Sequence, residues 1–226
     1  MKVIVCLLSG GIDSTVAAAL AARDARNRVT LLSIYYGQGA EEAERVVSRR
    51  VGEWLVSHFP NVVDHEVLEI HGTQQGFVGW RTPSRGWPQA GYPSTRDEVF
   101  ALIAAAGLEA RLCDVAETTE GEVVLATNAD DVKNFSDIDP DTYRVDLNRV
   151  LARKVMPQAG KPMRISLPLI DKTKAEVVRL GVEIGAPLHL TWSCYFGEPE
   201  KPCGACDQCR WRRDAFAYAG LSDPAF

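Results

Sequence analysis

The sequence lacks any long apolar run. None of its segments approaches the ~18 consecutive apolar residues of a membrane-spanning helix. The opening run, Met1 to Leu8, meets Ser9 and two glycines before it reaches the length of the apolar region of a secretory signal. We therefore expect a cytoplasmic protein that does not act in a membrane.

An excess of positive charge is also missing. The 226 residues include 25 Lys and Arg against 30 Asp and Glu, which gives a formal net charge of −5. Surfaces that bind nucleic acid are usually basic, so a nucleic-acid partner is not expected. The sequence contains no internal repeat and no low-complexity linker. Its length suits one large domain, or one domain with a small appendage.

Apolar, β-branched runs alternate with amphipathic or alanine-rich segments along the chain. The expected strands are 3–8, 29–36, 62–70, 123–127 and 165–169, and the expected helices are 14–23, 41–59, 98–113, 145–155, 174–184 and 211–219. This alternation predicts an α/β fold with a doubly wound, mainly parallel sheet. Ligands bind such sheets at the edge formed by the carboxyl ends of the strands. Two polar segments, 71–95 and 128–143, follow strands at that edge and are predicted to be loops.

A glycine loop stands between the first expected strand and the first expected helix. It reads LSGGIDST over Leu8–Thr15 and lacks the lysine of a nucleotide-hydrolysing P-loop. Its two glycines allow close backbone approach, and the following helix N-terminus presents N–H groups to an anion. Asp13 can hold Mg²⁺, which bridges phosphates. A plain strand–helix turn capped by Asp13 or Ser14 is the alternative, but the whole string favours phosphate binding.

Four cysteines cluster near the C-terminus, whereas Cys6 and Cys113 are isolated. The cluster consists of Cys194, Cys203, Cys206 and Cys209. Two overlapping C-x-x-C pairs have good chelate spacing, and four thiolates suit a closed tetrahedral Zn²⁺ site. An iron–sulfur cluster and a redox pair remain as alternatives.

The glycine loop resembles the SGGxDS signature of the ATP pyrophosphatase, or PP-loop, superfamily. That resemblance implies an adenine-nucleotide α-hydrolase-like fold and cleavage of ATP between the α and β phosphates. It implies adenylation of a substrate oxygen, after which a nitrogen or sulfur nucleophile displaces AMP. A loop that grips pyrophosphate has no need of the P-loop lysine. The matching nucleotide-binding residues are Ser9, Gly10, Gly11, Asp13, Ser14 and Thr15.

Further segments are similar to the 7-cyano-7-deazaguanine (preQ0) synthase, or QueC-like, family. They are the YGQ string at 36–38, the DK segment within 168–176, and the TWSCY string at 191–195 that leads into the cysteines. The resemblance implies conversion of 7-carboxy-7-deazaguanine, an amine (ammonia) and ATP to an amide and then a nitrile. It also implies Mg²⁺, structural Zn²⁺, a homodimer, and a division into a PP-loop domain (1–189) and a zinc-binding tail (190–226).

The resemblance assigns further residues to the site. Asp13, Lys172 and Arg96 would act in catalysis, and Gly37 and Gln38 would contact the nucleotide. The segments 92–97 and 128–144 depart from the family pattern, so other acceptors stay open. They include a different amine, even one on a protein, and arrest at the amide. A PP-loop tRNA-modifying enzyme and a non-catalytic nucleotide sensor are the more distant alternatives.

Overall fold

A computed structural model describes the chain over residues 1–38, 40–70, 96–116, 120–135, 139–154, 160–198 and 201–225. The predicted loop at 71–95 lies outside these described residues.

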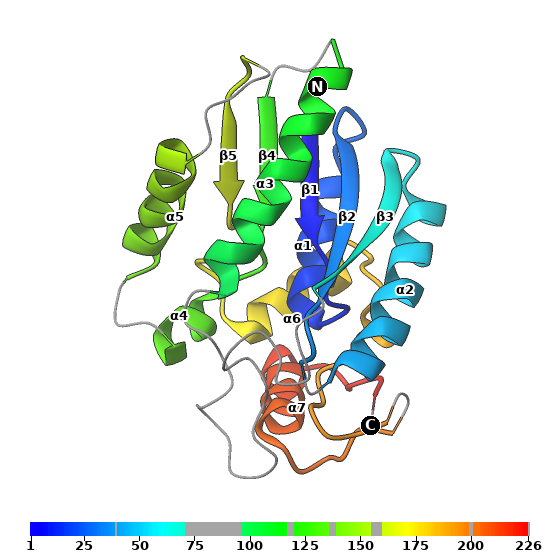
Figure 1. Cartoon of the computed structure of the whole chain (residues 1–226). Coiled ribbons are helices and arrows are strands. Elements are labelled where there is room, and N and C mark those ends of the chain that lie inside the picture. Colours follow the sequence, from blue (N-terminus) through cyan, green and yellow to red (C-terminus); the bar gives the residue numbers. More distant parts are fainter. Residues whose placement is uncertain are drawn as a thin grey trace.

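The described residues form a five-stranded sheet. Its strands are β1 (Lys2–Leu7), β2 (Arg28–Tyr35), β3 (Val62–Glu69), β4 (Glu120–Val124) and β5 (Met163–Ser166). The order is β3-β2-β1-β4-β5 and every pair is parallel, which confirms the predicted doubly wound α/β fold. The chain winds outward from β1 in both directions, so a topological switch point lies at the carboxyl end of β1. Figure 1 shows the strand ends gathered at one edge.

Helices cover both faces of the sheet. They are α1 (Ile12–Ala22), α2 (Glu41–His58), α3 (Arg96–Asp114), α4 (Ala129–Phe135), α5 (Pro140–Lys154), α6 (Lys174–Glu183), the short 3₁₀ helix η1 (Leu188–Leu190) and α7 (Asp207–Ala219). One buried cluster joins α1, α2, α6 and α7 to the sheet, and a second joins α3, α4 and α5 to its other face. In Figure 1, α3 crosses in front of the strands and α1 lies behind them.

The central strand and the first helix show why the sheet packs tightly. Val3, Val5 and Cys6 are at most 2% exposed, as expected for a parallel strand that is buried on both faces. The alanines of α1 favour helix and leave little bulk between the helix and the sheet. The glycine loop between them is therefore fixed at both ends by buried elements.

The predicted loop at 128–143 is wrong, because it contains α4 and the start of α5. Asn128 Oδ1 accepts from the Asp131 N–H at 3.0 Å and caps α4. Asp139 Oδ1 accepts from the Thr142 N–H at 3.0 Å, and Pro140 is the first residue of α5, a position that proline favours. The described acidic residues of this segment are a helix cap, Asp139, and first-turn residues, Asp130, Asp131 and Asp141.

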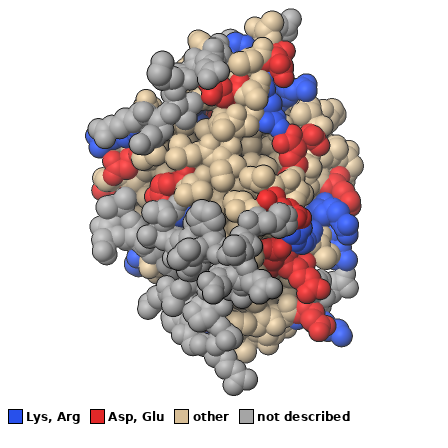
Figure 2. Space-filling view, viewed as in Figure 1, with Lys and Arg blue, Asp and Glu red and all other residues tan. Residues whose placement is uncertain are grey.

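The cysteine-bearing tail packs on the rest of the chain. Cys194, Cys209 and Phe216 belong to the buried cluster that contains α1 and α6. Among the helices of the described residues, none is both long enough and apolar enough to cross a bilayer. On the face seen in Figure 2, the described acidic and basic side chains are interspersed.

Candidate functional site

The glycine loop lies at the switch point between β1 and α1. Gly10 has φ +81°, and a Cβ there would lie 2.8 Å from the Ser48 backbone nitrogen and 2.9 Å from Val47 Cγ1. Ser48 belongs to α2, and its hydroxyl is hydrogen-bonded to Tyr35 OH at 2.7 Å. Because the backbone of α2 lies so close to Gly10 and φ is positive there, only glycine fits at position 10.

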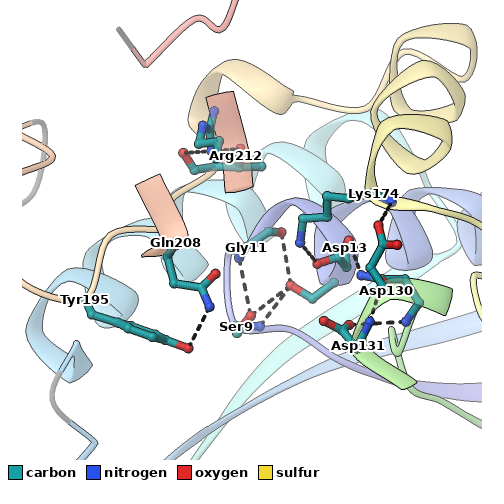
Figure 3. Close-up of polar contacts among 12 residues, drawn as sticks. Ser9, Gly11, Asp13, Asp130, Asp131, Lys174, Tyr195, Gln208 and Arg212 are labelled. Carbon is teal, nitrogen blue, oxygen red and sulfur yellow. Dashed lines mark hydrogen bonds and ion pairs between the residues drawn. The ribbon is translucent and has the colours of Figure 1, made fainter. Parts of the chain in front are cut away.

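The loop hydroxyls bond mainly to the loop itself. Ser14 Oγ accepts from the Ser9 N–H at 3.2 Å, and Ser9 Oγ accepts from the Gly11 N–H at 3.3 Å (Figure 3). Thr15 is fully buried, and its hydroxyl has no hydrogen-bond partner among the residues described. Gly11, the N-cap of α1, has no side chain with which to cap the first turn. The serines thus shape the loop, while the helix start is available to an anion.

Asp13 is the centre of a polar cluster built from three segments. Its carboxylate forms an ion pair with the Lys174 ammonium at the start of α6. Asp13 Oδ1 also accepts from Nδ2 of Asn128, the residue before α4, at 3.2 Å. Asp13 and Lys174 are 17% and 22% exposed, so both can be reached from solvent. Figure 3 shows Lys174 and Asp13 facing each other from different helices.

The charged groups of this cluster shift one another's pKa values. Burial lowers the pKa of Lys174, but Asp13 and Asp131 outweigh it and raise that pKa above its ordinary value, so the ammonium stays charged. Burial and the charge of Asp13 raise the pKa of Asp131 to about 6. Asp130 also approaches, since its Oδ2 accepts from the Lys174 N–H at 2.8 Å. Two carboxylates, Asp13 and Asp131, thus act on one ammonium, that of Lys174, and leave the cluster with an excess of negative charge.

The ammonium of Lys174 meets the glycine loop at Asp13, whereas the catalytic role of Lys172 stays a prediction. The Lys172 carbonyl accepts from the Ala129 N–H at 2.9 Å and joins α4 to the segment before α6. Lys174 follows Thr173, which forms a capping box with Glu176. A cation in the first turn of a helix is disfavoured by the helix dipole. A lysine inside a capping box, at the first position of the helix, was thus the signal for a carboxylate partner.

The YGQ turn follows β2 and is closed by α2. Gly37 has φ +86°, and its N–H donates to Glu41 Oε2 at 2.6 Å. Gln38 Oε1 accepts from the Tyr36 N–H at 2.9 Å, while Gln38 Nε2 donates to Glu44 Oε2 at 2.7 Å. Both ends of the Gln38 amide therefore stabilise the turn.

Arg96 begins α3 beside this turn. Its guanidinium contacts Asp97 at 3.3 Å and Tyr36 OH at 3.5 Å, and lies 6.0 Å from the centre of the Phe100 ring. The rings of Tyr36 and Phe100 meet edge to face at 5.3 Å. A cationic and aromatic surface thus stands near the carboxyl end of β2.

Tyr195 of the tail points toward the same region. Gln208 Nε2 donates to Tyr195 OH at 3.2 Å, as Figure 3 shows. Burial raises the pKa of Tyr195 to about 12, against the opposing influence of Arg96. The phenol is therefore neutral and can donate a hydrogen bond at ordinary pH.

The four predicted metal ligands lie together. Their sulfur atoms are all within 4.8 Å of one another. Cys206 Sγ lies 3.4 Å from Cys209 Sγ and 4.0 Å from Cys194 Sγ, and Cys203 Sγ lies 4.0 Å from Cys209 Sγ. A tetrahedral Zn²⁺ with bonds of about 2.3 Å has S–S edges of about 3.8 Å, so the cluster fits a structural metal ion. The Gly197 N–H also donates to Cys194 Sγ at 3.0 Å, which favours a thiolate there.

The comparisons with known proteins concern the family of the chain. Residues 3–220 match the family described as queuosine biosynthesis protein QueC. The chain is 35% identical over 231 residues to 7-cyano-7-deazaguanine synthase of Sulfolobus acidocaldarius, covering 99% of this chain but only 47% of that protein. The chain thus spans about half the length of this relative.

Two further relatives match over nearly their whole lengths. The 7-cyano-7-deazaguanine synthase of Methanothrix thermoacetophila is 33% identical, with 97% of this chain and 96% of that protein covered. The enzyme of the same name from Microcystis aeruginosa is 32% identical, with 99% and 95% covered. The resemblance predicted from the motifs is confirmed, and the chain belongs to the QueC family.

Proposed function

We propose that the protein is an ATP-dependent ligase that adenylates the carboxylate of 7-carboxy-7-deazaguanine. Ammonia then gives the amide, and a second activation gives the nitrile. Membership of the QueC family and the names of the relatives, 7-cyano-7-deazaguanine synthase, support the nitrile product. The observation that carries the proposal is the lysine-free glycine loop, on which Asp13 meets the ammonium of Lys174.

The arrangement suits a reaction in which pyrophosphate leaves. A carboxylate is a poor electrophile, and transfer of AMP to its oxygen provides a leaving group. The loop N–H groups and Lys174 stabilise the negative charge that develops on the departing pyrophosphate. Asp13, with Asp130 and Asp131 beside it, would hold Mg²⁺, which supplies further charge neutralisation for the phosphates.

The amide oxygen needs the same activation in the second half of the reaction. Transfer of a second AMP to that oxygen makes it a leaving group, and loss of the nitrogen protons then gives the nitrile. One phosphate loop can serve both halves, because each half releases pyrophosphate from ATP.

The cysteine centre has a different role. Four cysteines hold Zn²⁺ with no open coordination position, so the ion would be structural. Binding of the ion would stabilise the fold of the tail that carries Tyr195 and α7.

The direct test is incubation with 7-carboxy-7-deazaguanine, Mg-ATP and ammonium. We expect AMP, pyrophosphate and the nitrile, with the amide as an intermediate, all measured by mass spectrometry. Asp13→Asn should abolish AMP formation, and a reaction without ammonium should yield no nitrile. Failure of the wild-type protein to cleave ATP with this acid would refute the proposal. AMP release without amide or nitrile would point instead to another acceptor.

A further inference from the structure

The tail contacts the phosphate loop directly through the backbone. The Trp192 N–H donates to the Gly10 carbonyl at 3.0 Å. The Trp192 ring is buried, and its Nε1 donates to the Cys194 carbonyl at 2.7 Å. A residue two positions before a predicted metal ligand is therefore hydrogen-bonded to the loop.

This contact determines which way the loop N–H groups point. The Gly10 carbonyl and the Gly11 N–H belong to one planar trans peptide unit, so they point in opposite directions. When Trp192 holds the carbonyl, it also fixes the Gly11 N–H on the other side of the loop, toward Ser9 Oγ. Rotation of this peptide unit would change the set of donors that an anion meets.

Arg212 of α7 holds the Thr191 carbonyl, which belongs to the same peptide unit as the Trp192 N–H. Its Nη1 donates to the Thr191 carbonyl at 3.2 Å and to Thr191 Oγ1 at 2.9 Å, and its Nε donates to Asp223 Oδ2 at 2.9 Å. Arg212 is 2% exposed, and its Nη2 has no partner within the described part of the chain. Figure 3 shows this guanidinium above the loop.

Burial of the Arg212 guanidinium costs desolvation free energy. An apolar side chain of similar volume would often give equal or greater stability, whereas a planar fork fixes its acceptors in two directions. Arg212 stands three positions after Cys209, on a helix whose N-cap is Cys206. It thus connects the cysteine centre to residues 191 and 192, and through Trp192 to the loop.

We propose that Arg212 is a positioning residue for the phosphate loop. It holds the Thr191 carbonyl and hydroxyl, and this holds the Trp192 N–H in place. Trp192 in turn orients the Gly10–Gly11 peptide, whose N–H donates to Ser9 Oγ and so fixes the shape of the loop that meets the pyrophosphate. The proposal rests on the proposed function, since it assumes that this loop binds the pyrophosphate portion of ATP.

The main test compares variants that keep the local charge balanced. Arg212→Met alone would leave Asp223 buried and unpaired, so it is combined with Asp223→Asn. Thr191→Val is a second, milder change, because it removes the hydroxyl that accepts from Arg212 and donates to the Leu188 carbonyl, and it keeps Arg212 and Asp223. Arg210→Met is the matched control, since Arg210 lies on the same helix with a side chain 60% exposed.

The readouts are the affinity for Mg-pyrophosphate by calorimetry, the KM for ATP and for the acid, the zinc content and the melting temperature. We expect the double variant to keep its zinc and to lose roughly tenfold or more in pyrophosphate affinity. Its KM for ATP should rise while its KM for the acid stays unchanged. Thr191→Val should show a smaller loss in the same direction, and Arg210→Met should match the wild type.

Several outcomes would overturn the inference. One is a folded, zinc-loaded double variant with wild-type pyrophosphate affinity. Another is an equal loss in Arg210→Met. If the double variant does not fold, Thr191→Val decides, and unchanged affinity in that variant overturns the inference. A wild-type protein that binds neither pyrophosphate nor ATP would instead refute the proposed function.

Discussion

Replacement of Lys174 by methionine tests the charge that stands opposite the phosphate loop. The change keeps most of the apolar stem and removes the ammonium that pairs with Asp13. Asp13 and Asp131 raise the pKa of this ammonium in the wild type. Because Asn128 still donates to Asp13 and the carboxylate is 17% exposed, the protein should remain folded. We expect a loss of about 1.5–3 kcal/mol in the free energy of unfolding.

The effect on turnover should be larger than the effect on stability. Loss of one preorganised donor at a site of developing charge costs about a hundredfold to a thousandfold in kcat, or about 3–4 kcal/mol. The local negative charge increases at the same time, so the affinity of the site for Mg²⁺ should rise or stay constant. Slower turnover without weaker Mg²⁺ binding would therefore identify Lys174 as the group that stabilises the leaving pyrophosphate.

The assay is the rate of AMP release at saturating Mg-ATP and acid, with melting temperature and Mg²⁺ titration as accompanying measurements. Lys172→Met is the informative comparison, because the family resemblance assigns the role to Lys172 while the structure places Lys174 at Asp13. We expect the smaller loss in Lys172→Met. The reasoning would be refuted if Lys174→Met kept wild-type kcat, or if Lys172→Met lost more.

Three other predictions concern the loop, the sheet and the tail. Gly10→Ala should abolish Mg-pyrophosphate binding in calorimetry, because its Cβ would meet the backbone of α2 at 2.8 Å; unchanged binding would contradict this. The Ser33 hydroxyl donates to the Leu8 carbonyl, so His65 Nε2 donates to Ser33 Oγ at 2.8 Å. Burial lowers the pKa of His65 below its ordinary 6.5. The unfolded chain then binds more protons, so urea stability should fall as the pH drops below about 6.5, and His65→Asn should lose this dependence. Cys206→Ser should lower the metal content from about one ion per chain and lower the melting temperature; full metal content would exclude Cys206 as a ligand.

Local patterns allowed the strands, the glycine loop and the cysteine ligands to be predicted. A buried parallel strand is a continuous apolar run, as in β1, and a chelating cysteine pair has a short fixed spacing. The glycine loop combined a strand end, two glycines and a helix start within a few residues. Each of these signals is complete within one segment of sequence.

The remaining features depend on contacts between distant segments. Asn128 and Asp139 belong to residue types that suit both loops and helix caps, and only their observed hydrogen bonds show that they are caps. Lys174 and Asp13 are 161 positions apart, so their pairing follows from the order of β1, β4 and β5 in the sheet. The need for glycine at position 10 depends equally on α2, which a single segment cannot reveal.

In a P-loop, the phosphate-binding backbone and the lysine that reaches the phosphates belong to one segment, whereas here they belong to two. A P-loop lysine follows the phosphate loop itself and reaches the phosphates from it. Here Lys174 begins a separate helix, where Glu176 Oε2 accepts from the Thr173 N–H at 2.8 Å and fixes the start of α6. The loop is held instead by α2 and by the Trp192 N–H. Weakening the capping box should therefore lower kcat with little change in pyrophosphate affinity, whereas weakening the contact of Trp192 with Gly10 should lower that affinity first.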